Sequence, residues 1–136
     1  MEEIKIIKII TEEITEPRKD GTRGSSLYSI PFKLNATPSS LWIDAFIKTW
    51  NLPPSYTSMH RPGIASVSGD RIILDGTTIE EVKDTHKKTL ELCISEANRI
   101  EQEILENKQK QKEQDKKKSD EFRRNLETKA KEIHFE

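Results

Sequence analysis

The chain has 136 residues, of which 32% are apolar and 35% are charged, and its formal net charge is -1. This balance gives no global electrostatic reason to expect nucleic acid or an anionic membrane as partner. A single cysteine excludes an internal disulfide and a multi-cysteine zinc site. No apolar run reaches the ~20 residues of a membrane span, and the acidic start does not resemble a signal peptide. We therefore expect a cytoplasmic protein without membrane contact.

The first third of the chain predicts two strands. Residues 4–14 are rich in isoleucine without clean alternation, which favours a strand buried on both faces over a short helix. A polar, glycine-containing loop is expected at residues 16–25. Apolar and polar residues then alternate over residues 28–34, as in a half-buried strand. Pro31 has no N–H to donate, so we expect this strand at a sheet edge or at a bulge.

A helix is expected from Pro38 to about Trp50. Thr37 is the predicted N-cap, and proline is favoured at the first helical position. The helix carries a broad apolar face, which exceeds what one thin sheet comfortably covers. We therefore expect Trp42 or Trp50 to reach an interface with another molecule.

Residues 51–63 contain three prolines and no periodicity, which is typical of a long loop. Long loops in small domains are often functional. This one carries Tyr56, Met59, His60 and Arg61, a combination suited to binding a partner. The alternative is a purely structural loop whose Tyr56 and Met59 pack inward.

Two strands, 64–68 and 71–74, are expected around a turn at Gly69-Asp70, with Asp75-Gly76 closing the hairpin. Thr78 and Glu81 have the spacing of a capping box, in which each side chain bonds the other's backbone N–H. The order is therefore β-β-α-β-β-α. It predicts an α+β domain over residues 1–106, with two helices packed on one face of a small antiparallel sheet.

From Thr78 onward the chain has no glycine or proline and reads as one long helix. Its apolar stripe includes Cys93, which predicts a buried, inert thiol. The stripe stops after Leu105, so residues 107–136 form a charged helical tail. A hinge or disorder at residues 109–119 remains open beside an unbroken helix, and a continuous coiled coil is not expected there. The stripe resumes weakly at Phe122, Leu126, Ala130 and Ile133.

Two further functions compete with protein binding. An enzyme would use His60, Asp75 and His86, with Asp75 orienting His86 as a general base. The sequence contains no nucleophile turn and no metal-ligand spacing, so we expect no catalysis, cofactor or metal site. A nucleic-acid accessory protein would use the lysines of the tail, but they alternate with carboxylates along the sequence.

The preferred interpretation is a non-catalytic protein–protein interaction module, a subunit or adaptor of a larger assembly. The partner is a foreign protein or a second copy of the chain. The candidate binding residues lie in the 51–63 loop and the tail: Trp50, Tyr56, Met59, His60, Arg61, Phe122, Leu126 and Ile133.

Overall fold

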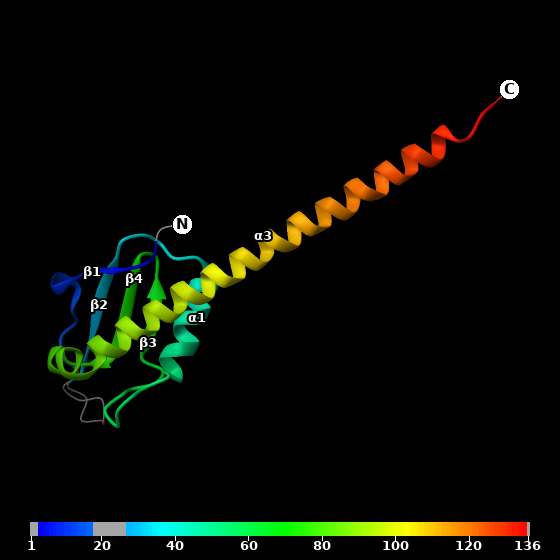
Figure 1. Ribbon diagram of the computed structural model, residues 1–136. Helices are drawn as coiled ribbons and strands as arrows, with labels where there is room; N and C mark the ends of the chain where they lie inside the picture. The colour runs from blue at the N-terminus through cyan, green and yellow to red at the C-terminus, as the bar shows by residue number, and fades with distance from the viewer. Residues whose placement is uncertain (1–2, 18–26, 136) are drawn as a thin grey trace. The chain divides into compact units, whose positions relative to one another are not determined.

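The computed structural model describes residues 3–17 and 27–135. Within them, one antiparallel sheet has the strand order β1-β2-β4-β3, built from β1 (Ile6–Ile9), β2 (Tyr28–Leu34), β3 (Ala65–Ser68) and β4 (Arg71–Thr77). Helix α1 (Ser40–Asn51) and the first part of helix α3 (Lys87–Lys131) cover the same face of this sheet (Figure 1). The predicted α+β class is confirmed.

The core lies between that sheet face and the two helices. In the register of β2 and β4, Ile30 stands opposite Leu74 and Phe32 opposite Ile72, so all four side chains share one face. They are nearly or completely buried. The helices contribute further buried side chains to this core, which are Trp42, Phe46 and Trp50 from α1 and Leu90, Cys93 and Ala97 from α3.

Strand β1 is shorter than predicted and is covered on one side only. It is the outer strand of the sheet, and its pairing with β2 shifts register between Ile6 and Lys8. Ile4 and Ile10 are buried, but Ile7 is 58% exposed. A 3₁₀-helix, Thr11–Glu13, follows instead of more strand. The prediction of a strand buried on both faces is therefore wrong. Of the predicted loop 16–25, residues 18–25 lie outside the described residues.

Pro31 lies in a central strand, which corrects the prediction of an edge or a bulge. The β1–β2 pairing runs from Leu34 to Phe32 and ends one residue before Pro31. The Pro31 carbonyl accepts a hydrogen bond from the Ile10 N–H at 3.0 Å. The ladder with β1 ends at this position, so it loses little through the missing proline N–H.

Helix α1 begins later than predicted. Its N-cap is Ser39, whose side chain accepts a hydrogen bond from the Trp42 N–H at 3.2 Å, so Thr37 is not the cap. Ser39 also donates a hydrogen bond to the carboxylate of Glu101 on α3. This second bond explains the shift, since it links the start of α1 to the neighbouring helix.

The hairpin of β3 and β4 has its turn at Gly69-Asp70 as predicted, and Gly69 has a positive φ of 59°. However, β4 continues to Thr77, so Asp75-Gly76 lies inside the strand and does not close the hairpin. Gly76 has a φ of 111° next to a register shift between β2 and β4. A glycine is favoured there because bulged strands use such backbone angles.

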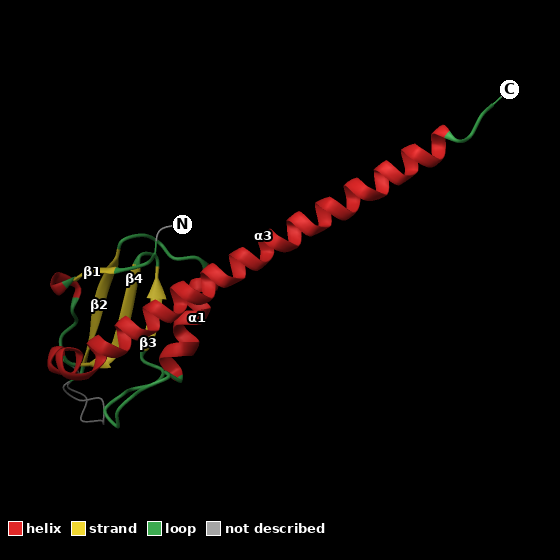
Figure 2. Cartoon of the chain, in the orientation of Figure 1, coloured by secondary structure: helices red, strands yellow, loops and turns green. Residues whose placement is uncertain are grey.

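The chain divides into two compact units, Met1–Glu101 and Gln102–Glu136. Helix α3 continues from the first unit into the second, and its helical structure is unbroken through residues 109–119 (Figure 2). Side-chain bonds one turn apart support the helix here, including Gln109 to Glu113 at 3.4 Å and Gln111 to Asp115 at 3.0 Å.

Candidate functional site: an anchored loop and an exposed helix face

The 51–63 loop is fastened to α1 at both ends. The Gly63 N–H donates to the Asn51 side-chain oxygen at 2.8 Å, and Gly63 has the positive φ of 84° that glycine accommodates. The Trp50 indole N–H donates to the Arg61 carbonyl at 3.0 Å. Inside the loop the His60 N–H bonds the Thr57 carbonyl at 3.1 Å. The loop is therefore an ordered part of the first unit.

Three aromatic rings, one of them from the loop itself, pack together. Trp50 is fully buried, and its ring centroid lies 4.6 Å from His60 and 5.5 Å from His86. The two imidazole centroids are 6.3 Å apart. His60 Nε2 lies 2.7 Å from the Trp50 carbonyl, which can only accept, so this nitrogen carries the proton. Trp50 therefore offers no surface to a partner, which corrects its assignment to the binding residues.

An ion pair joins the loop to the helix that follows β4. Arg61 binds both carboxylate oxygens of Glu81, at 2.7 and 2.8 Å. This hydrogen bonding lowers the pKa of Glu81, and it raises the pKa of Arg61. Thr77 donates to the same carboxylate at 3.2 Å. A two-pronged, charge-assisted contact of this kind fixes the orientation of both side chains.

Only half of the predicted capping box is present. The Thr78 hydroxyl accepts a hydrogen bond from the Glu81 N–H at 3.2 Å, as predicted. The Glu81 side chain does not return to the Thr78 N–H, because Arg61 and Thr77 hold it. The capping spacing does predict the start of helix α2 (Ile79–Glu81), but it says nothing about the distant arginine.

A π-turn, Val82–His86, joins α2 to α3 and was not predicted. Within it His86 is completely buried, and burial lowers its pKa despite the nearby Glu81 carboxylate. The distance from His86 Nε2 to Glu81 Oε2 is 3.4 Å. Within the described residues neither ring nitrogen of His86 makes a hydrogen bond. The π-turn adds a residue to the helical turn, a local feature that apolar periodicity does not reveal.

The structure brings together only two of the three residues of the enzyme hypothesis. His60 and His86 are neighbours, but Asp75 accepts a hydrogen bond from the Ser29 hydroxyl at 2.6 Å on the sheet. Asp75 is exposed and His86 is buried, so the predicted Asp75–His86 pair is wrong. In the described part of the chain, no group of three or more His, Cys, Asp or Glu is arranged to hold a metal ion.

Cys93 is completely buried, as predicted, and burial raises the pKa of its thiol to about 12. The thiolate is the reactive form of cysteine, so this residue is inert at neutral pH.

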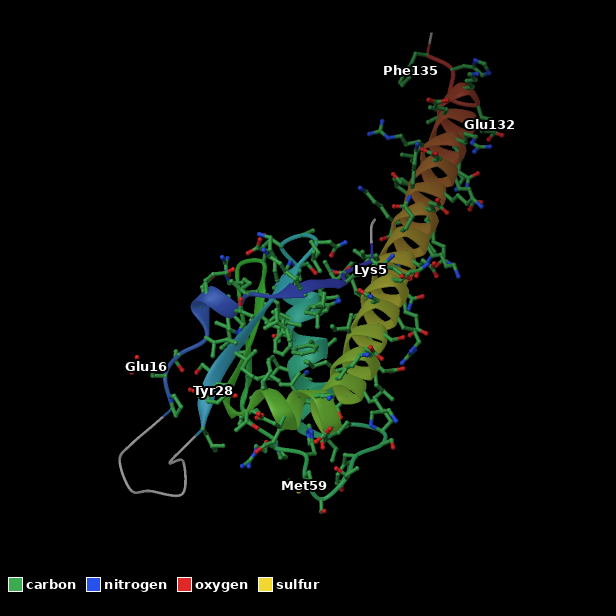
Figure 3. All side chains as sticks on the ribbon, turned by 90° about the vertical axis from the view of Figure 1, so that its left-hand side faces the viewer. Lys5, Glu16, Tyr28, Met59, Glu132 and Phe135 are labelled. Carbon is green, nitrogen blue, oxygen red and sulfur yellow. The ribbon has the colours of Figure 1, made fainter. Side chains whose placement is uncertain are left out.

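Two of the predicted loop residues remain exposed. Tyr56 is 63% and Met59 54% exposed, so neither packs inward. Figure 3 shows Met59 at the tip of the loop, with its side chain directed away from the sheet. His60 is buried to all but 9%. Arg61 forms an ion pair with Glu81. His60 and Arg61 therefore hold the loop in place and are not available to a partner in the way that Tyr56 and Met59 are.

The second unit also exposes apolar side chains. Phe122 is 64% and Leu126 52% exposed, and they lie one turn apart on α3. Ile133 is 60% exposed but follows the end of the helix at Lys131, so it does not belong to the helical stripe. Phe135, 93% exposed, was missed because it falls beyond any periodic pattern.

No protein-family model, curated protein or solved structure matches this chain. None of the helices in the described residues is long and apolar enough to cross a membrane.

Proposed function

We propose that the protein is a non-catalytic interaction module, a subunit or adaptor that binds another protein through the tail helix and the 51–63 loop. The main support for this proposal is the exposure of Phe122 and Leu126 in the polar part of α3 that follows Leu105. Burying a side chain of this size contributes roughly 1.5–3 kcal/mol. Two such residues one turn apart are the usual anchors of a helix bound in a groove.

The loop provides a second contact of the same kind. Tyr56 and Met59 are residue types enriched at protein interfaces. The bonds of Trp50 and Arg61 hold the loop in one shape, so binding loses little conformational entropy. Partial burial by a partner would convert both exposed side chains into contact area.

A photo-crosslinking residue at a single position tests this function. Benzoylphenylalanine is introduced at position 122, in the cells from which the protein comes, and the matched control carries it at position 120. Asp120 lies on the opposite side of the same helix. We expect a covalent adduct with one protein from position 122 and none from position 120. Equal labelling from both positions, or none, would contradict the proposal.

A further inference from the structure

Charge is unevenly distributed around the exposed part of α3. An α-helix turns by about 100° per residue, so the helix can be divided into a side that carries Phe122 and Leu126 and the side opposite. On the Phe122 side the only carboxylate between residues 107 and 131 is Asp115. The basic residues on this side are Lys108, Lys112, Lys118, Arg123 and Lys129.

The opposite side has a different composition. Its carboxylates, Glu113, Asp120, Glu121 and Glu127, are interspersed with basic residues such as Lys117. The alternation of charge along the sequence therefore separates into two sides once the chain is helical. We name the side with Phe122, Leu126 and the five basic residues the basic apolar face.

This charge distribution disfavours a second copy of the chain as the occupant of the face. In a parallel pair each basic residue would meet its own counterpart. In an antiparallel pair that places Phe122 against Leu126, Lys118 would lie opposite Ala130, one residue away from Lys129. Like charges brought together at an interface are strongly unfavourable. The occupant must therefore bring negative charge.

The two apolar anchors distinguish among negatively charged occupants. A nucleic-acid duplex would engage the lysines through phosphates and leave Phe122 and Leu126 unused. A helix lying in a membrane surface needs a longer apolar stripe than two large residues. A protein groove with apolar walls and a rim of carboxylates uses both features of the face.

We propose that the basic apolar face binds an apolar groove rimmed by carboxylates on a partner protein. This inference rests on the proposed function and specifies the chemistry of the partner. Phe122 and Leu126 fill the groove, and the flanking lysines pair with the carboxylates at its edge.

Calcium-loaded calmodulin, an acidic protein whose adaptable groove accepts basic amphipathic helices, is the probe. Binding to the full chain is measured by titration calorimetry. The Phe122→Ala/Leu126→Ala variant should bind at least about 30-fold more weakly, as expected when hot-spot anchors are truncated. Circular dichroism checks that the variant keeps its helix.

Charge reversal supplies a matched control. Lys112→Glu/Lys118→Glu on the face and Lys117→Glu/Lys131→Glu on the opposite side change the net charge equally. We expect about tenfold weaker binding for the first pair and less than about twofold for the second. Absence of binding by the unaltered chain, survival of binding in the Phe122→Ala/Leu126→Ala variant, or equal effects of the two pairs would overturn the inference.

Three further measurements on the full chain identify other occupants. The inference would be overturned if the chain bound phosphatidylserine–phosphatidylcholine vesicles or a DNA duplex more tightly than it binds calmodulin. It would also be overturned by a dimer in light scattering that dissociates in the Phe122→Ala/Leu126→Ala variant. If position 122 forms an adduct in cells but the chain does not bind calmodulin, the proposed function is retained and only the inferred chemistry of the partner is refuted. Absence of that adduct would refute the proposed function itself.

Discussion

Glu81 connects the loop, the sheet and the long helix through one carboxylate. It accepts hydrogen bonds from Arg61 and Thr77 and lies beside the buried His86. The Glu81 side chain is 17% exposed and the Arg61 side chain 38%, so solvent screens the pair only in part. Because a charge-assisted pair in this setting is stronger than a fully exposed one, we expect it to contribute measurably to stability.

We predict that Glu81→Gln lowers the free energy of unfolding by about 1–2 kcal/mol, because it removes the charge that Arg61 binds. Denaturant unfolding followed by tryptophan fluorescence measures this change. Glu80→Gln is the matched control: Glu80 is the exposed neighbour on the same helix and should change stability by less than about 0.5 kcal/mol. Equal effects of the two substitutions would show that the Arg61 contact has no special weight.

His86 makes stability depend on pH. Burial holds the pKa of His86 below its ordinary value of 6.5. Glu81 favours its charged form, while His60 and Arg61 oppose it, and the net pKa shift remains downward. Below pH 6.5 the unfolded chain therefore binds more protons than the folded chain. The contribution of neutral His86 is complete above pH 6.5 and is lost as the pH falls toward its folded pKa.

We predict that the free energy of unfolding decreases between pH 6.5 and pH 5 by up to about 1.4 kcal/mol per pH unit. The Glu81 carboxyl, whose pKa is also lowered, adds its own loss at lower pH, below about its ordinary value of 4.5. His86→Gln should flatten the slope above pH 5, whereas His134→Gln, in the exposed C-terminal segment, should leave it unchanged. A slope that survives His86→Gln would assign the titration to another group.

At the scale of elements, two substitutions at the start of α1 distinguish the observed N-cap, Ser39, from the predicted one, Thr37. Ser39→Ala removes both the hydrogen bond from the Trp42 N–H and the bond to Glu101. We expect it to cost about 1–2 kcal/mol of unfolding free energy. Thr37→Ala should cost less than about 0.5 kcal/mol, because Thr37 does not cap the helix. Thermal unfolding compares the two variants, and a larger loss for Thr37→Ala would refute the cap at Ser39.

Most elements could be predicted because their signals are local. The alternation in β2, the turn at Gly69-Asp70 and the Thr78 cap depend on neighbouring residues and were predicted correctly. The errors came from long-range contacts. The extent of burial of β1 depends on its outer position in the sheet, and the Ser39 cap is supported by Glu101, which is remote in sequence. Asp75-Gly76 looks like a turn locally, but pairing with β2 extends the strand through it.

The candidate site was also predicted only in part, because local patterns reveal some of its residues and long-range contacts determine the others. Tyr56, Met59, Phe122 and Leu126 were identified from loop composition and helical spacing, and all four are exposed. The burial of Trp50 depends on His60 and His86, which lie in different segments. No sequence pattern announces that arrangement or the Arg61–Glu81 pair. The π-turn that buries His86 also has no signature in apolar spacing.

At the scale of the whole molecule, apolar residues are divided unequally between the two units. The unit Met1–Glu101 contains the buried core, and from Leu105 to Phe135 every residue is exposed. A polar helix without tertiary packing is held mainly by its own backbone bonds and by side-chain pairs one turn apart. Its amides should therefore open far more readily than those of the sheet.

Amide hydrogen exchange on the purified full-length chain tests this division most directly. We predict that residues 107–131 exchange no more than about 100-fold more slowly than an unstructured peptide, while β2 and β4 are protected to nearly the global stability. Protection of residues 119–131 at the level of β2 and β4 would contradict the account. It would mean that Phe122 and Leu126 are already buried without any partner.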